Sequence, residues 1–299
     1  MMRDANTLIR GRSQFLLTVF FFIATAVADA QSEAESTYSE VFYLSGDLRI
    51  QAYLYKPDGD GPFPVVIYNH GSRDGRESAS VPFQYIGKML TRAGYVVLVP
   101  ERRGYGKSDG SMWRQDVGND QSRLITRLQA EADDVLAAID YLRTVPSADT
   151  NRIGIMGWSF GGIVTMLAAS RSAAFVVAVD QAGGALTWDG NAYLRRALVA
   201  AAEKSVTPTL FMVAKNDRTT LSITTLAEIF KARDVPHRMV IYEPFTPAQR
   251  IRVAAPGHAL FSEQGANVWE SDLVQFLGRY LGATVSDKRD GTAVPKTQQ

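Results

Sequence analysis

The stretch of sequence that decides the fold is residues 152–164, which read Arg-Ile-Gly-Ile-Met-Gly-Trp-Ser-Phe-Gly-Gly-Ile-Val. Its apolar residues 153–156 predict a buried strand, and a helical pattern starts with Ile163, directly after a Gly-x-Ser-x-Gly sequence centred on Ser159. A strand, a tight turn and a helix in this order form a nucleophile elbow, which lifts the serine above the carboxyl edge of a sheet. The N–H groups at the start of the helix would face any anion that forms there. Ser159 is therefore the candidate nucleophile.

The rest of the chain alternates in the same way between apolar runs and amphipathic segments. Strands are expected at 41–44, 48–55, 65–69, 96–99, 153–156, 175–179, 209–214 and 237–242, and helices at 82–92, 124–142, 163–168, 193–204, 221–232 and 268–281. This alternation predicts an α/β fold with a doubly wound, mostly parallel sheet of about eight strands, helices on both faces and an antiparallel hairpin at one edge. The domain is expected to span residues 31–281. It includes a small insert at 182–208, whose helix is expected to cover part of the cleft, and a polar, disordered tail is expected at 282–299.

Composition excludes several classes of function. The 299 residues carry a formal net charge of +1 and no long block of like charges, which argues against a nucleic acid as partner. The chain has no cysteine, so a disulfide, a thiolate metal site and a cysteine nucleophile are ruled out. Glu131, Asp133 and Asp134, within the helix expected at 124–142, are interpreted as a solvated face rather than a metal site. We expect no metal ion and no cofactor, and the oligomeric state stays open.

The first thirty residues have the features of a secretory signal peptide. Arg3, Arg10 and Arg12 form a positive region, residues 15–27 form an apolar run, and Ala28-Asp29-Ala30 matches a cleavage site. We therefore expect this segment to direct export to the periplasm or the medium and then to be removed, which leaves no stable membrane span. The alternative is an uncleaved membrane anchor, although an apolar run of this length is short for a span.

A serine hydroxyl needs a base to take its proton, and a histidine is the usual base. The chain has three histidines. His70 ends a strand and is expected to be a structural residue of the turn, and His237 starts a strand and therefore lies at the opposite edge of a parallel sheet. His258 follows the last strand, in a loop at the carboxyl edge, where ligands bind in such sheets. Elimination favours His258 as the base.

The histidine in turn needs a carboxylate on its other nitrogen. Asp217 is the preferred candidate because it follows the strand expected at 209–214. It also lies between the serine and the histidine in the chain, which gives the order Ser, Asp, His. Asp180 at the end of the preceding strand and Asp189 in the insert remain as alternatives.

The oxygen of an attacked carbonyl becomes negative and needs fixed hydrogen-bond donors. The backbone N–H of Phe160, directly after the nucleophile, is one candidate. The N–H of Ser72, in the loop after the strand 65–69, is the other, and Arg73 is an alternative to Ser72. These donors would form an oxyanion hole beside the serine.

Aromatic side chains near these positions are candidates for the substrate pocket. Trp158 precedes the nucleophile, and Tyr105 and Trp113 lie in a long polar loop at 101–122. A loop of this length in a compact domain is often functional.

Four motifs together resemble the α/β-hydrolase superfamily, and more narrowly its dienelactone hydrolase and prolyl-oligopeptidase-like branch. They are residues 68–72 (Tyr-Asn-His-Gly-Ser), 99–108 (Val-Pro-Glu-Arg-Arg-Gly-Tyr-Gly-Lys-Ser), 157–162 (Gly-Trp-Ser-Phe-Gly-Gly) and 256–258 (Pro-Gly-His). The resemblance covers about residues 40–281. The chain departs from these families because it has Ser159 where dienelactone hydrolases have a cysteine, and because it has no room for the propeller domain of prolyl oligopeptidases.

The resemblance implies a serine hydrolase that cleaves a small-molecule carboxylic ester through an acyl-enzyme on Ser159, with Asp217 and His258 completing a Ser-Asp-His triad. The same machinery would serve a small peptidase or amidase, or a thioester or lactone hydrolase. An alternative from another class is a catalytically silent binding protein, because a fold alone does not confer activity.

Overall fold

The structure, a computed structural model, describes residues 37–73, 75–118, 120 and 122–282. The signal peptide expected at 1–30, and all but the first residue of the tail expected at 282–299, lie outside this part of the chain. No helix within the described part is long and apolar enough to cross a membrane.

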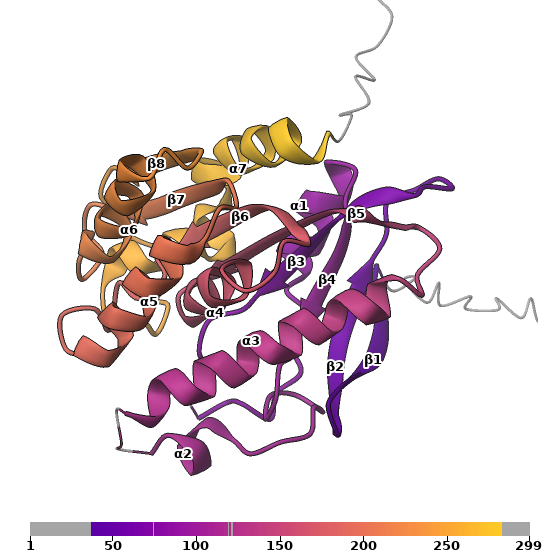
Figure 1. The fold of residues 1–299 in the computed structure, drawn as a ribbon, viewed down its shortest axis with the longest axis horizontal. Helices are drawn as coiled ribbons and strands as arrows, with labels where there is room; N and C mark the ends of the chain where they lie inside the picture. The colour runs from indigo at the N-terminus through magenta and orange to yellow at the C-terminus, as the bar shows by residue number, and fades with distance from the viewer. Residues whose placement is uncertain (1–36, 74, 119, 121, 283–299) are drawn as a thin grey trace, which may run out of the picture. The chain divides into compact units, whose positions relative to one another are not determined.

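One eight-stranded sheet forms the centre of the fold (Figure 1). Its strands are β1 (Ser39–Ser45), β2 (Leu48–Tyr55), β3 (Phe63–Asn69), β4 (Val96–Pro100), β5 (Ala148–Trp158), β6 (Phe175–Gln181), β7 (Thr209–Ala214) and β8 (His237–Tyr242). They lie in the order β1-β2-β4-β3-β5-β6-β7-β8. β2 pairs antiparallel with β1 and β4, and all later pairs are parallel. This arrangement confirms the predicted fold class, including the antiparallel hairpin at one edge.

Helices cover both faces of the sheet (Figure 1). They are α1 (Gln84–Arg92), α2 (Trp113–Asp116), α3 (Arg123–Leu142), α4 (Phe160–Ala169), α5 (Ala192–Lys204), α6 (Leu221–Ala232) and α7 (Ala266–Leu281), with short 3-10 helices η1 (Pro256–Phe261) and η2 (Glu263–Gly265). α3, α4, α5 and α6 pack side by side in one layer, and α1 and α7 lie on the other face. α5, the helix of the insert expected at 182–208, packs beside α4 and α6 in this layer.

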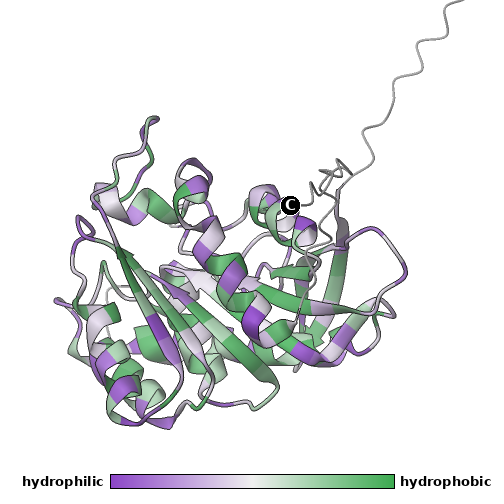
Figure 2. Ribbon diagram, turned by 90° about the horizontal axis from the view of Figure 1, so that it is seen from above, coloured by the Kyte–Doolittle hydropathy of each residue, from purple (hydrophilic) through white to green (hydrophobic). Residues whose placement is uncertain are grey.

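The core lies along the two faces of the central strands, which are coloured mostly as hydrophobic in Figure 2. Val65, Val66 and Ile67 of β3 have no exposed surface, because helices cover this strand from both sides. Full burial of such a side chain contributes about 1.5–3 kcal/mol. The sheet is therefore a rigid base for the loops at its carboxyl edge.

β5 starts earlier than expected and is longer than its apolar run. Residues 148–152 extend the strand because Ala148 and Asp149 pair with Phe63 and Pro64 of β3, before a shift in register at Val65. The extension is part-buried and polar, so hydrophobicity alone does not reveal it. Its carboxyl end, which carries the nucleophile elbow, lies where the sequence predicts.

Candidate active site

Ser159 occupies a tight turn between β5 and α4, with φ 60° and ψ −119°. Positive φ is strained for a residue with a side chain. Close backbone packing on both sides keeps Ser159 in this conformation. A Cβ on Gly161 would overlap the carbonyl oxygen of Asn69, and a Cβ on Gly157 would overlap the carbonyl of Gly161. The N–H of Ser159 also donates to the carbonyl oxygen of Gln181 at 2.9 Å. The local sequence therefore forms a nucleophile elbow because glycine is the only residue that fits at both flanks.

A chain of hydrogen bonds joins the three residues that the sequence singled out. His258 Nε2 lies 2.9 Å from Ser159 Oγ, and His258 Nδ1 lies 2.8 Å from Asp217 Oδ2. His258 is 1% exposed and Asp217 is 8% exposed, so water does not compete for the second bond. With Asp217 ionised, Nδ1–H donates to the carboxylate and Nε2 is free to accept the proton of the serine.

Close backbone packing keeps the two partners of Ser159, Asp217 and His258, next to each other. His258 lies on η1, which follows β8, and Asp217 lies just beyond β7. Gly257 packs so closely on Asn216 that a side chain there would overlap it. Asp217 Oδ1 also accepts the N–H of Arg218 at 2.7 Å, which fixes the carboxylate plane. The loops after two neighbouring strands are thus packed against each other where histidine and aspartate meet.

The alternative acids and bases lie elsewhere. Asp180 is fully buried at the end of β6, where its Oδ1 accepts the N–H of Gly183 at 2.7 Å, and burial raises its pKa to about 7. Asp189 is exposed. The ring of His237 contacts the carbonyl oxygen of Val235 at 2.8 Å, at the start of β8 and hence at the opposite edge of the sheet.

His70 is buried in the turn after β3, where Nδ1 lies 2.6 Å from the carbonyl oxygen of Gly71. Burial lowers its pKa well below the usual value, and the guanidiniums of Arg102 and Arg73 lower it further. A neutral, fully enclosed imidazole fits the structural role expected from the sequence.

The loop after β3 lies directly against the nucleophile. A Cβ on Gly71 would be 3.3 Å from both Ser159 Cβ and the carbonyl oxygen of Trp158. Ser72 follows and is exposed. Phe160 is the first residue of α4, where an N–H has no partner within the helix. Both expected oxyanion donors therefore lie on segments that flank Ser159, and their role as donors stays a prediction.

Two of the three aromatic candidates for the substrate pocket lie beside this group. The ring of Trp158 is 5.7 Å from the ring of His258, and the ring of Trp113 is 5.0 Å from that of Phe160. The side chain of Tyr105 is only 1% exposed and does not line the cavity described below, and its place in the substrate pocket stays a prediction.

Tyr105 is instead enclosed by polar neighbours. Its ring packs edge-on against His70 at 4.8 Å and lies 5.0 Å from the guanidinium of Arg73. A loop aromatic can face either the solvent or the interior, and its sequence position does not distinguish the two.

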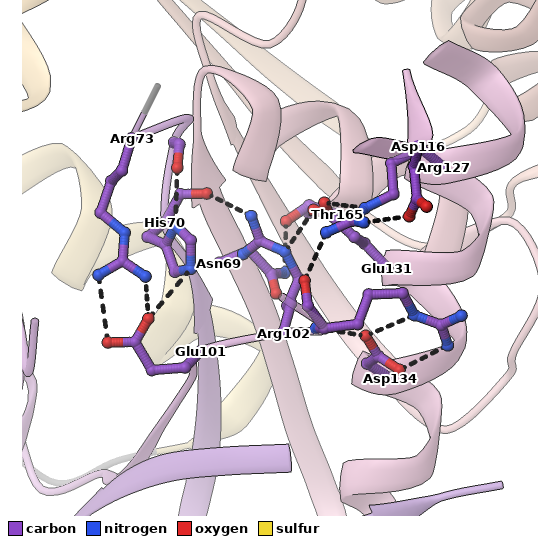
Figure 3. A network of polar contacts seen from close by, with 12 residues as sticks. Asn69, His70, Arg73, Glu101, Arg102, Asp116, Arg127, Glu131, Asp134 and Thr165 are labelled. Carbon is purple, nitrogen blue, oxygen red and sulfur yellow. Dashed lines mark hydrogen bonds and ion pairs between the residues drawn. The ribbon is translucent and has the colours of Figure 1, made fainter. Parts of the chain in front are cut away.

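A cluster of largely buried charges lies behind the loop after β3 (Figure 3). We call it the buried charge network; its members are Arg73, Glu101, Arg102, Arg103, Arg127, Glu131 and Asp134. Arg102 donates from Nε to Glu131 at 2.8 Å and from Nη2 to the carbonyl oxygen of His70 at 2.8 Å. Glu101 pairs with Arg73, whose Nη1 also donates to the carbonyl oxygen of Ala79. The network therefore anchors both sides of the loop that carries Gly71 and Ser72.

The network overturns part of the prediction for α3. Glu131 and Asp134 do not form a solvated face; they are 1% and 0% exposed, and they pair with arginines of the loop after β4. Asp133 lies in its expected position, on the exposed side of the helix in an ion pair with Arg171. The sequence signal that was available is the run Glu101-Arg102-Arg103 at the end of a buried strand, because charges in such a position need partners.

A cavity of about 300 Å³ is lined by Trp158, the residue before Ser159; we call it the Trp158 cavity. Its apolar walls are Val81, Phe83, Tyr85, Trp158, Ile251 and Val253, and its other lining residues are Gly71, Ser72, Arg73, Arg76, Ala79, Arg252, Ser262 and Glu263. Among the described residues, no group of three or more His, Asp or Glu side chains could hold a metal ion. A hydrogen-bonded serine and histidine with an apolar cavity nearby suit acyl transfer from a small molecule.

Curated relatives match part of the chain. It is 28% identical over 142 residues to the quorum-quenching protein AidA of Acinetobacter baumannii, a match that covers 48% of this chain and 42% of that protein. It is 30% identical over 136 residues to the thiohydrolase aneE of Aspergillus aculeatus, which covers 45% and 38%. The chain thus spans less than half the length of these two relatives.

Solved structures share the fold over most of the described chain. An acylaminoacyl peptidase of Pyrococcus horikoshii superposes with a TM-score of 0.63 at 20% identity, covering 85% of this chain and 43% of that one. The esterase Pf2001 of Pyrococcus furiosus has a TM-score of 0.58 at 17% identity, with 82% and 92% covered. At these identities the likeness shows the α/β-hydrolase fold.

The model of the dienelactone hydrolase family matches residues 50–271, which include every strand from β3 to β8, the elbow, Asp217 and His258. Hydrolases of ester and peptide substrates are among the structural neighbours. The chain belongs to the dienelactone hydrolase family.

Proposed function

We propose that the protein is a serine hydrolase that cleaves a small carboxylic ester through an acyl-enzyme on Ser159. The observation that carries the proposal is the unbroken hydrogen-bond chain from Ser159 through His258 to Asp217. A buried carboxylate that orients a histidine, which in turn contacts a strained, accessible serine, is the arrangement that makes a hydroxyl nucleophilic.

In the acylation step, His258 Nε2 takes the proton of Ser159 while Oγ attacks the ester carbonyl. The carbonyl oxygen becomes negative and accepts the N–H groups of Phe160 and Ser72. His258 then gives its proton to the leaving alcohol oxygen as the bond to the carbonyl carbon breaks. Asp217 stays ionised and stabilises the imidazolium that forms between these two transfers.

In the deacylation step, a water molecule takes the place of the alcohol. His258 removes its proton, hydroxide adds to the acyl carbon, and the same two N–H groups hold the oxygen. Collapse releases the carboxylic acid and returns the proton to Ser159. The residues require no metal or organic cofactor for either step.

The proposal is tested with a fluorophosphonate probe and 4-nitrophenyl esters of short and medium chain length. Wild-type protein should be labelled and should turn over at least one ester, and Ser159→Ala should lose labelling and roughly four or more powers of ten in turnover. Ser170→Ala is the matched control, because Ser170 lies at the other end of α4 and its hydroxyl donates to the carbonyl oxygen of Leu167. A folded wild-type protein that is neither labelled nor active would favour a binding protein with this fold.

We also propose that residues 1–30 direct export. The support is the positive region, the apolar run and the Ala-x-Ala site in the sequence. Expression of the full chain followed by cell fractionation and mass determination should give a product that begins at Gln31, outside the cytoplasm. Recovery of the uncut chain in the membrane would identify an anchor instead.

A further inference from the structure

We infer that the Trp158 cavity binds the leaving alcohol of the ester, rather than its acyl group, and selects alcohols with an apolar, ring-sized body. The inference rests on the proposed function, since it assigns one half of the substrate to one side of Ser159. Three features support it: the loops that form the cavity, the position of His258, and the apolar side chains of the walls.

The cavity lies beside His258, although neither His258 nor Ser159 lines it. Two of its wall segments flank this histidine in the chain, residues 251–253 before it and residues 262–263 after it. A third wall is Trp158, whose ring packs on the imidazole at 5.7 Å and an angle of 38°. The fourth is the loop from Gly71 to Arg73, which carries one of the proposed oxyanion donors. The cavity is therefore bounded by the proposed oxyanion loop and by the tryptophan that packs on the proposed base.

The chemistry of proton transfer decides which part of an ester lies there. When the tetrahedral intermediate collapses, the leaving oxygen must receive a proton from His258 Nε2, so this oxygen must lie within about 3 Å of that nitrogen. The fourth substituent of the carbon, the acyl chain, must then point away from His258. The rings of Phe160, which directly follows Ser159, and of Trp113 pack with their centres 5.0 Å apart at an angle of 32°, and neither residue lines the cavity. The acyl chain lies along this aromatic pair.

The walls set the kind of alcohol. The inner surface carries Phe83, Tyr85 and Val253, all partly or wholly apolar. Arg76 and Arg252 are exposed and have no ion-pair partner within the described part of the chain. A volume of about 300 Å³ is at the lower end of the range for small-molecule pockets. An aromatic or cyclic alcohol with polar substituents at its outer end fits both features.

Filling the cavity tests the inference. Val253→Phe places a ring where the alcohol is expected, in a loop residue that is only half-buried. One ester series keeps the acetyl group and varies the alcohol from methyl to phenyl to 2-naphthyl; a second keeps 4-nitrophenol and varies the acyl group from acetyl to butyryl to octanoyl. We expect Val253→Phe to lower the naphthyl-to-methyl ratio of kcat/KM by about ten-fold or more. The octanoyl-to-acetyl ratio and the deacylation rate of the common acetyl-enzyme should stay unchanged.

Two further variants make the result unambiguous. Trp113→Ala, on the aromatic pair, should change the acyl ratio and leave the alcohol ratio unchanged. If Val253→Phe proves insoluble, Val253→Ala serves as the test. This variant enlarges the cavity and should raise the naphthyl-to-methyl ratio of kcat/KM. A change in the acyl ratio alone, or unchanged ratios in both series for a folded Val253→Phe or Val253→Ala, would overturn the inference. Failure of the proposed function is separate, because the wild-type protein would then neither bind the fluorophosphonate probe nor hydrolyse any ester.

Discussion

Replacing Glu131 with glutamine removes the charge that holds two buried arginines. Glu131 is 1% exposed and accepts hydrogen bonds from Arg102 Nε at 2.8 Å and from Arg127 Nε at 2.9 Å. Removing one partner of a buried ion pair leaves an uncompensated charge, which costs about 3–5 kcal/mol. Arg102 keeps its bond to the carbonyl oxygen of His70, and Arg127 keeps its bond to Asp116. We therefore expect a loss in the free energy of unfolding at the lower end, about 3 kcal/mol.

The matched control lies two residues away on the same helix. Asp133 pairs with Arg171, and both side chains are well exposed, at 51% and 37%. Such a surface pair contributes about 0–1 kcal/mol, so Asp133→Asn should have little effect. The two variants change the same kind of group in the same element and differ mainly in burial.

Urea unfolding at neutral pH, followed by circular dichroism, measures the difference. The midpoint for Glu131→Gln should fall with an unchanged m-value, which indicates a loss of stability rather than a change in compactness. If the free energies of unfolding of the two variants differ by less than about 1 kcal/mol, the reasoning is refuted. Burial would then not increase the contribution of an ion pair to stability.

The remaining predictions concern the elbow, the buried aspartate and the proposed triad. Gly161→Ala should fail to fold or lose about 3 kcal/mol or more in the free energy of unfolding, since its Cβ would overlap the Asn69 carbonyl. Gly190→Ala, with nothing within 4 Å of its Cβ, should melt within a few degrees of wild type. Equal melting points for the two variants would show that the elbow can accommodate the added methyl group. Burial raises the pKa of Asp180 from 3.8 to about 7, so the folded protein keeps a proton that the unfolded chain releases, and this contribution to stability is complete below about pH 4 and is lost as the pH rises through about 7. Asp180→Asn should therefore lose less stability than wild type between about pH 4 and pH 8, and an identical change in urea midpoint would count against the shift. Asp217→Asn should lower kcat by about 10⁴-fold, because the tautomer of His258 is no longer fixed; an equal loss in Asp180→Asn would mean that the acid is misassigned.

Much of the fold could be predicted because its signals are local. The apolar runs of β3, β4 and β7 are long enough to read as buried strands, and their alternation with helices implies a parallel sheet. The hydrogen-bonded Ser159, His258 and Asp217 could be singled out because only three histidines compete and strand order places one at the right edge.

What could not be predicted depends on contacts between distant segments. Glu131 and Asp134 read as surface residues on a helix, and their partners Arg102 and Arg103 lie some thirty positions earlier, in a loop whose path no periodicity describes. Tyr105 gives the same aromatic signal whether it faces substrate or the interior. The Trp158 cavity is formed by loops from four parts of the chain, so no single stretch of sequence contains it.

The close approach of Gly161 to the carbonyl oxygen of Asn69 separates two properties of this protein. The segments that carry the nucleophile and the oxyanion donors are locked together through their backbones, within the rigid end of the sheet. Trp113, in the loop at 101–122, and the cavity residues 251–253, in the loop at 243–257, lie outside that backbone contact. Substitutions at these positions can accumulate under selection for a new substrate while the proposed reaction centre keeps its shape. Libraries restricted to Trp113 and residues 251–253 should therefore yield folded, reactive variants with altered selectivity far more often than libraries spread over the whole chain.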